Sequence, residues 1–250
     1  MNRRFATMKN KQNDVSTKIR RGAQWMGIGV IAIAISFPVF AQDSAVQEKV
    51  NAVKQSMAEN TQKLHQYQWT ETTQVTLKGD PKPSSQKLCQ YGPDGQVQKT
   101  PIGPPPEQPS GGRLKQRIIE KEKEEMQDYM GDVKNLLAMY VPPDPQKMEQ
   151  AKQAGNVSLN PAPGSVNLVF INYAQPGDRM TLTFDTNAKR VTGLNINTYM
   201  GEAKDVVTLQ VQMGSLPDGT NYTQQTVLDA TAKKLQVTTT NSNYAKLGGY

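Results

Sequence analysis

The sequence is poor in the two side chains that most often bind metals or act as nucleophile and base. Among 250 residues there is one histidine, His65, and one cysteine, Cys89. A zinc site or a histidine-based catalytic triad needs several such groups together, so neither can be assembled from this inventory. A single thiol also excludes an internal disulfide bond.

Other motifs of catalysis and cofactor binding are missing as well. There is no EF-hand spacing, no Walker loop and no G-x-S-x-G. Acids gather in Glu120–Glu125, where they alternate with lysines as on a solvated helix face. We therefore predict no catalytic residue, no metal and no cofactor, and a protein that is not an enzyme. A calcium site among five aspartates at expected turns and strand ends stays open as an alternative: Asp178, Asp185, Asp205, Asp218 and Asp229.

The net positive charge is small outside the N-terminal segment. The whole chain carries a formal charge of +7, with 29 basic and 22 acidic residues. Seven of the bases and one of the acids lie in residues 1–41, which leaves 22 bases and 21 acids in residues 42–250. Basic patches interleaved with aromatic side chains are also absent, so nucleic acid is excluded as a partner.

The chain has a single long apolar run, and it lies near the N-terminus. Residues 26–40 (MGIGVIAIAISFPVF) carry no charge and follow a basic segment that includes Arg20-Arg21. Val39-Phe40-Ala41 is typical of a cleavage site, so we predict a secretory signal peptide over 1–41 and a periplasmic location. The run is shorter than the roughly 20 residues of a membrane span, and after cleavage no transmembrane span remains. An uncleaved anchor and twin-arginine export are the alternatives.

The first part of the remaining chain changes its hydrophobic period twice. Ser44 is a candidate N-cap of an amphipathic helix whose apolar residues recur at helical spacing from Val46 to Leu64. Alternation from Tyr67 to Leu77 then predicts a one-sided strand, and strands follow at 86–91 and 96–100. Residues 101–112 (PIGPPPEQPSGG) predict a linker or loop. Two roles stay open for it: a hinge for the helical pair, or a spacer without a role of its own.

Two helices and a run of strands follow. A long helix is expected over 113–141, and Asp144-Pro145 is typical of the start of a short one, closed by Gly155. From Asn156, apolar alternation broken by polar turns about every ten residues predicts an antiparallel meander. Its strands are expected at 157–160, 166–173, 180–184, 191–199, 206–213, 222–229 and 235–240.

These elements predict an α+β fold. We expect a large curved antiparallel sheet of about ten strands, an incomplete β-barrel, because a sheet of that size curls. The N-terminal helix and the inserted helical pair lie on its concave face. Residues 42–250 then form a single domain with a helical insertion at 113–155.

The order of the elements over 44–242 resembles the periplasmic lipoprotein-carrier fold, which includes the lipoprotein localisation carrier and its outer-membrane acceptor. The resemblance implies a half-barrel, closed over by helices, with a hydrophobic cavity. Four segments also look like those of an uncharacterised family of exported bacterial proteins: YQWTETTQVTLKGD (67–80), CQYGPDGQVQKT (89–100), YVPP (140–143) and LPDGTNY (216–222). Residues 67–100 contain no arginine to match the one at the carrier's cavity entrance, so no individual binding residue is carried over.

The predicted function is binding or carrying a lipid, a lipidated ligand or another hydrophobic ligand in the half-barrel. The alternative is an envelope scaffold or interaction protein in which the same side chains are a filled core. Envelope protein partners fit both interpretations. The predicted ligand-lining residues are Tyr67, Trp69, Val75, Leu77, Met126, Met130, Leu182, Phe184, Leu194, Ile196, Leu209 and Val211.

Overall fold

One antiparallel sheet organises the protein, and its first and last long strands are neighbours. The computed structural model describes residues 39–103 and 113–248, with side chains from 44 and, after the gap, from 120. Over these ranges the strands are ordered β4-β3-β1-β11-β10-β9-β8-β7-β6-β5, with the short β2 paired to β1. Because β4 and β5 are the two edges, the sheet is not closed. The predicted α+β fold with an incomplete barrel is confirmed, with eleven strands in the described ranges.

The strands keep the expected alternation between a buried and a solvated face. In β7, for example, Met180, Leu182 and Phe184 are buried while the residues between them are not. The strand bounds are β1 Tyr67–Leu77, β2 Asp80–Pro81, β3 Ser85–Tyr91, β4 Val97–Ile102, β5 Val157–Ala162, β6 Ser165–Ile171, β7 Arg179–Asp185, β8 Arg190–Tyr199, β9 Val206–Ser215, β10 Asn221–Ala230 and β11 Leu235–Lys246.

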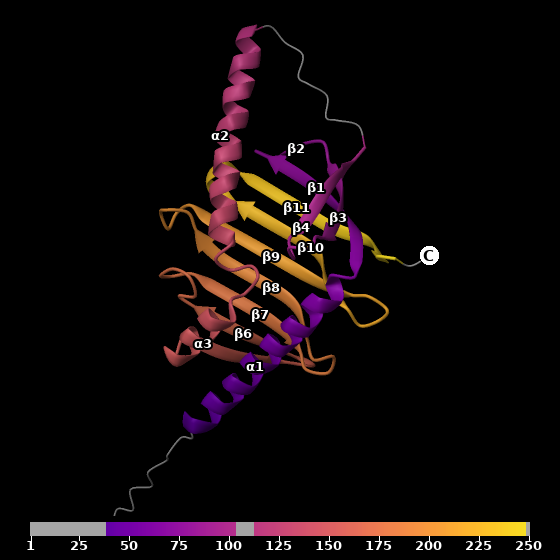
Figure 1. The fold of residues 1–250 in the computed structure, drawn as a ribbon. Helices are drawn as coiled ribbons and strands as arrows, with labels where there is room; N and C mark the ends of the chain where they lie inside the picture. Colours follow the sequence, from indigo (N-terminus) through magenta and orange to yellow (C-terminus); the bar gives the residue numbers. More distant parts are fainter. Residues whose placement is uncertain (1–38, 104–112, 249–250) are drawn as a thin grey trace, which may run out of the picture. The chain divides into compact units, whose positions relative to one another are not determined.

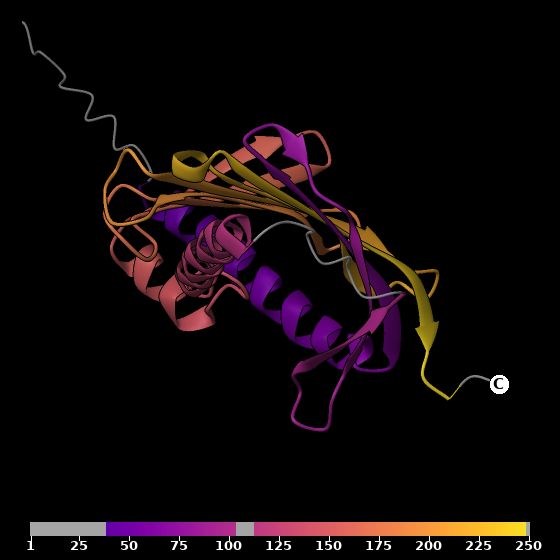
Figure 2. The same cartoon turned by 90° about the horizontal axis from the view of Figure 1, so that it is seen from above.

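All three described α-helices lie on the concave side of the sheet. They are α1 Val39–Leu64, α2 Arg113–Leu137 and α3 Pro145–Gln153, and a 3-10 turn, η1 Thr231–Lys233, joins β10 to β11. Figure 2 shows the sheet as an arc with the helices beneath it, and Figure 1 shows α1 crossing the strands while α2 extends past the sheet. None of the helices in the described part is both long and apolar enough to cross a membrane.

The main core lies between α1, α3, the C-terminal half of α2 and strands β6 to β8. Helix α1 contributes Val46, Val50 and Val53, and its contacts run to β5, β6, β8, β10 and α3. Helix α2 adds Tyr129 and Val133, both buried. Side chains from these elements fill the concave side over this half of the sheet.

Several boundaries differ from the sequence predictions. Helix α1 begins at Val39, so Ser44 lies within the helix and is not its N-cap. Helix α2 ends at Leu137 because the chain must turn before the Pro142-Pro143 pair. Strand β11 continues to Lys246 because it pairs with β1 along nearly its whole length.

The predicted linker also needs a correction at its start. Pro101 and Ile102 belong to β4, opposite Lys87 and Gln86 of β3. Proline is tolerated there because β4 is an edge strand, where one row of backbone N–H groups needs no partner in the sheet. The rest of the predicted linker, residues 104–112, lies outside the described ranges. Residues 1–38 of the predicted signal peptide lie outside them as well.

Candidate functional site

An apolar cleft opens on the concave face where α1 crosses the sheet. Its volume is about 180 Å³. One wall is α1, a second is the 141–143 segment between α2 and α3, and the floor is the inner face of β7 to β10. The lining side chains are Ser56, Met57, Asn60, Thr61, Val141, Pro142, Pro143, Leu182, Val191, Leu194, Val211, Met213, Asn221 and Thr223.

The helix wall of the cleft is tied to the sheet by two asparagines. The Asn60 side-chain amide donates to the Asn221 carbonyl oxygen at 2.6 Å, and the Asn221 backbone N–H donates to Asn60 Oδ1 at 2.6 Å. The Asn221 side chain donates in turn to the Val191 carbonyl oxygen at 2.7 Å. Three lining residues therefore hold one another in place, and the C-terminal half of α1 is fixed over the strands.

The second wall is held by a buried polar cluster. Tyr140, fully buried, donates to Asp178 Oδ2 at 2.6 Å and lies 2.8 Å from Thr198 Oγ1. Asp178 also accepts from the backbone N–H groups of residues 173, 174 and 175. Burial first, and then the Asp178 hydrogen bond, raise the pKa of Tyr140 far above its usual value. Every oxygen in the cluster has a partner, so we assign it to holding the 138–144 segment against the sheet.

The helices cover the two halves of the concave face unequally. Over β6 to β8 the inward side chains are almost fully enclosed, as with Leu168 and Leu182 at 0% and 1% exposure. On β9, β10, β11 and β1 the inner side chains of one register row, Val211, Thr226, Thr239 and Thr73, are only half-buried. In the next row Val237 and Val75 are half-buried as well, whereas Leu209 and Leu228 are buried. The concave face is thus filled on one side and partly open on the other, with the cleft at the boundary.

The twelve predicted lining residues fall into separate places. Leu182, Leu194 and Val211 line the cleft. Phe184, Ile196 and Leu209 are buried in the main core, and Val75 and Met130 pack against that core while half-buried. Leu77 and Met126 also pack there and line a second pocket, described below.

Tyr67 and Trp69 belong to a separate aromatic cluster near the start of β1. Trp69 stacks on Tyr244 with ring centroids 5.5 Å apart, and Tyr91 lies 5.6 Å from Trp69 and 4.3 Å from His65. Cys89 is fully buried beside Trp69, its partner in the β1–β3 register, and burial raises the pKa of its thiol. His65 is thus a stacking partner at the helix–strand junction.

Sequence reasoning missed the cleft residues contributed by α1 and by the 141–143 segment. Met57 was visible as part of the apolar stripe of the first helix, but its neighbour Asn60 carried no signal because polar helix residues usually face solvent. Pro142 and Pro143 directly follow the helix expected over 113–141 and indicate only that a helix ends there. Their place over the sheet depends on the Tyr140–Asp178 contact, which joins segments 38 residues apart.

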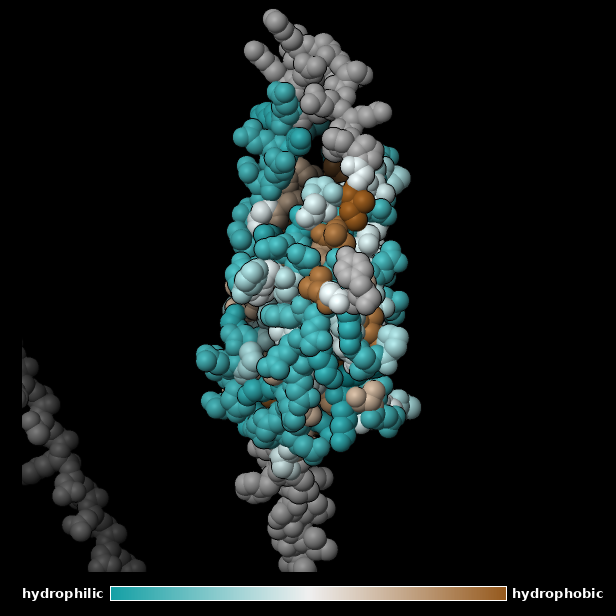
Figure 3. Space-filling model, turned by 45° about the vertical axis from the view of Figure 1, so that its right-hand side comes forward, coloured by the Kyte–Doolittle hydropathy of each residue, from teal (hydrophilic) through white to brown (hydrophobic). Residues whose placement is uncertain are grey.

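Two further observations concern the apolar side chains at the surface and the side chains that could bind a metal ion. Figure 3 shows brown side chains in a broken strip on a face that is otherwise mostly teal. Within the described ranges, no group of three or more histidine, cysteine or acidic side chains is placed to hold a metal ion. The large apolar side chains that are most exposed are Leu88, Val97, Ile102, Val141, Ile171 and Leu247.

Comparisons with known proteins give structural neighbours only. No family model and no curated protein matches the chain. Among solved structures it is similar to a DUF1329 family protein from Desulfovibrio piger, with TM-score 0.40, 10% identity, and coverage of 82% of this chain and 94% of that one. It is also similar to a putative outer membrane lipoprotein-sorting protein domain from Vibrio parahaemolyticus, with TM-score 0.38, 9% identity and the same coverages.

A third structure is a LolA superfamily protein from Nitrosomonas europaea, with TM-score 0.36, 10% identity, and coverage of 84% and 94%.

Proposed function

We propose that this protein is a non-enzymatic periplasmic protein that binds or carries a lipid, a lipidated molecule or another hydrophobic ligand. The ligand's apolar part lies in the cleft between α1 and strands β7 to β10 and extends over the half-buried inner side chains of β9, β10, β11 and β1. Residues 1–41 act as a cleaved signal peptide, and 42–250 form the mature domain with its helical insertion at 113–155.

The unequal covering of the concave face is the observation that carries this proposal. A core built only for stability gains from enclosing all its apolar side chains, yet Val75, Val211 and Val237 stay half-buried, and Val211 lines the cleft. The cleft volume of about 180 Å³ is of the size of an engineered cavity of about 150 Å³ that binds benzene. Burial of an alkyl chain contributes about 0.8 kcal/mol per methylene, so a short buried stretch supports binding.

The alternative function is an envelope scaffold that binds no ligand. It is favoured by the other half of the molecule, where Leu168, Phe170 and Met180 are completely buried between helices and sheet. The two proposals differ in what they require of Val211. In a carrier its side chain contacts ligand, and in a scaffold it is only a half-exposed residue.

The test is binding of a fluorescent fatty-acid probe to the mature protein, together with native mass spectrometry for co-purified lipid. Val211→Arg places a charge in the cleft floor and is expected to weaken probe binding about tenfold or more, since tenfold corresponds to about 1.4 kcal/mol. The control is Val227→Arg, a half-buried valine on the opposite face of the neighbouring strand. Equal affinity of both variants, or no probe uptake by the wild type, contradicts the carrier function. N-terminal sequencing of the exported protein tests the cleavage after Ala41.

A further inference from the structure

A second pocket, of about 400 Å³, separates α2 from the ends of the sheet strands next to it. On the sheet side it is bordered by three lysines from two adjoining turns, and on the helix side by two glutamates. Three uncharged residues lie between these walls. The lining residues are Lys78, Lys233 and Lys234, then Glu122 and Glu125, then Leu77, Met126 and Ala232.

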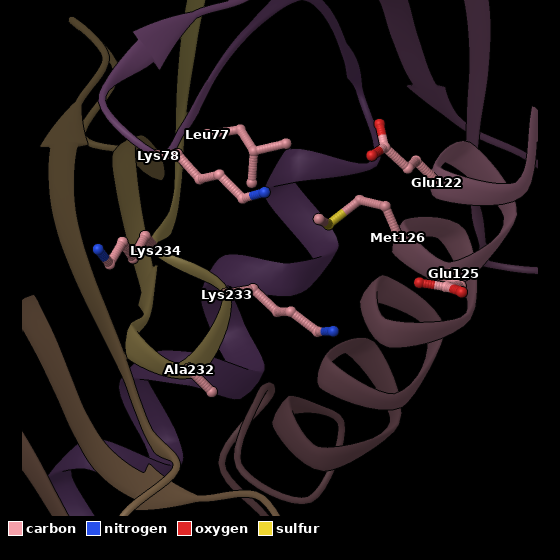
Figure 4. A pocket seen from close by; sticks show the side chains of 8 residues that line it. All are labelled: Leu77, Lys78, Glu122, Glu125, Met126, Ala232, Lys233 and Lys234. Carbon is pink, nitrogen blue, oxygen red and sulfur yellow. The ribbon is translucent and has the colours of Figure 1, made fainter. Parts of the chain in front are cut away.

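The two charged walls face each other without pairing. Figure 4 shows the ammonium groups of Lys78 and Lys233 reaching into the space, with Glu122 on the opposite wall and Lys234 directed away. In the part of the chain whose side chains are described, no ion pair joins a lysine of this pocket to Glu122 or Glu125, and Glu125 pairs only with Lys121 of its own helix, at 3.9 Å. The pocket therefore offers a cationic wall and an anionic wall with room for a group between them.

The cationic wall has a fixed backbone. The Lys78 N–H donates to the Lys234 carbonyl oxygen at 2.8 Å, which joins the turn after β1 to the turn before β11. The Lys233 ammonium lies 5.6 Å from the centre of the Tyr129 ring, within the range of a cation–π contact. Two positive groups on two strand ends are thus held on the same side of the pocket.

We propose that this pocket binds the zwitterionic head group of a phospholipid that carries a primary ammonium, with the phosphate toward Lys78 and Lys233 and the ammonium toward Glu122 and Glu125. The proposal rests on the proposed function and names its ligand class. A purely anionic head group meets two carboxylates here and a purely cationic one meets the ammonium groups of Lys78 and Lys233. A zwitterion pairs with both walls, and its ammonium donates hydrogen bonds that a quaternary amine cannot.

Inner side chains lead from this pocket to the cleft in the strand register, half-buried at Val75, Val237 and Thr226 and buried at Leu228 and Leu209. Leu77 lies two residues from Val75 on the inner face of β1, and Val75 pairs with Val237 of β11. From Leu77 to Val211 the path crosses three strand spacings and about four residues along a strand, a straight-line distance of about 20 Å. That span is comparable to an extended long acyl chain. A lipid whose head group lies in the pocket can therefore place its chain over the half-buried inner side chains and into the cleft.

The experiment measures binding of two short-chain lipids with identical tails, dihexanoyl phosphatidylethanolamine and dihexanoyl phosphatidylglycerol, to the mature protein by calorimetry. Wild type is expected to prefer the ethanolamine lipid about fivefold, as two exposed ion pairs allow. Glu122→Gln with Glu125→Gln is expected to remove or invert that preference, and Lys78→Gln with Lys233→Gln to weaken both lipids. The control pair is Glu120→Gln with Glu124→Gln, the same charge change on exposed residues of the same helix outside the pocket.

The outcomes separate this proposal from the proposed function. If wild type takes up the fatty-acid probe but binds both lipids equally, or if the control pair alters the preference as much as the pocket pair, the head-group site is overturned and the carrier function stands. If wild type binds neither the probe nor either lipid, both fail. Soluble glycerophosphoethanolamine serves as the competitor: the proposal expects it to bind far more weakly than the lipid, and equal affinity for both overturns a lipid as the source of the head group.

Discussion

Asn60 of α1 and Asn221 of β10 exchange two hydrogen bonds of 2.6 Å each across the edge of the apolar cleft, although 161 residues separate them in the chain. Each of the two bonds joins a side-chain group of Asn60 to a backbone group of Asn221. The contact is local to the cleft, and it makes the position of the helix wall dependent on one polar side chain.

Replacement of Asn60 by alanine tests this dependence. The variant leaves the Asn221 backbone N–H and carbonyl without these partners in a partly buried place, which is expected to cost about 1–3 kcal/mol of unfolding free energy. Urea denaturation measures the change. Gln55→Ala, an exposed residue one turn earlier in α1, is the control and should stay within about 0.5 kcal/mol. A loss of the same size in both variants would show that the asparagine pair does not hold the helix.

Gly214 of β9 lies against the Tyr222 ring, so an added side chain is expected to displace that ring. A Cβ atom at this position would lie 2.6 Å from the Tyr222 ring, closer than van der Waals contact allows. Gly214→Ala is therefore expected to destabilise the protein by about 1–3 kcal/mol, measured by thermal or urea unfolding. The cost should shrink when Tyr222 is replaced by leucine, because the clash is with the ring.

Gly131 of α2 provides the matched control for that substitution. Its added Cβ meets nothing within 4 Å. Since alanine is preferred to glycine in a helix, Gly131→Ala should raise stability by about 0.5–1 kcal/mol. Equal effects of the two alanine substitutions would contradict the clash at Gly214.

The hydrogen bond from the Tyr67 hydroxyl to Asp218 Oδ2, 2.6 Å long, predicts a pH-dependent stability difference. This bond is the largest of the interactions that hold the pKa of Asp218 well below its ordinary value. A carboxyl group whose pKa is lowered by folding stabilises the folded state above its unfolded pKa of about 3.9, and this stabilisation is lost as pH falls through the folded pKa.

Tyr67→Phe removes that bond and is the variant to measure. Its melting temperature should lie below that of wild type at pH 7, and the gap should narrow as the pH falls below about 4. Thermal unfolding followed by circular dichroism at several pH values gives both curves. A gap that is constant with pH would mean that Tyr67 acts through packing alone.

The sequence was sufficient to predict the helices and strands, but not which part of the concave face the helices leave uncovered. Strands such as β7 were predictable because Met180, Leu182 and Phe184 alternate with polar residues, and α3 because Asp144 caps it, accepting from the Gln146 N–H at 2.7 Å. The order of strands followed largely from the short turns between them. These signals depend on neighbours in the chain.

Which part of the sheet stays uncovered could not be predicted, because it depends on where the helices rest. Val211 and Leu194 are alike in sequence terms, and both line the cleft, yet Leu194 is 5% exposed and Val211 is only half-buried. The pairing of Tyr140 with Asp178, and of Asn60 with Asn221, brings distant segments together without a local pattern. The charged pocket at Lys78 and Glu122 arises in the same way.

The pairing of β1 with β11 has a consequence for how the chain reaches this state. Strand β1 follows the first helix directly. Its ten register pairs with β11 run from Leu77 opposite Leu235 to Tyr67 opposite Lys246, so they can form only after the chain between the two strands has been synthesised. Such long sequence separation slows folding, because the intervening chain must be ordered before the contact forms. In a chain synthesised only as far as β10, the edge of β1 that later pairs with β11 has no hydrogen-bonding partner. That edge is then accessible to chaperones and proteases.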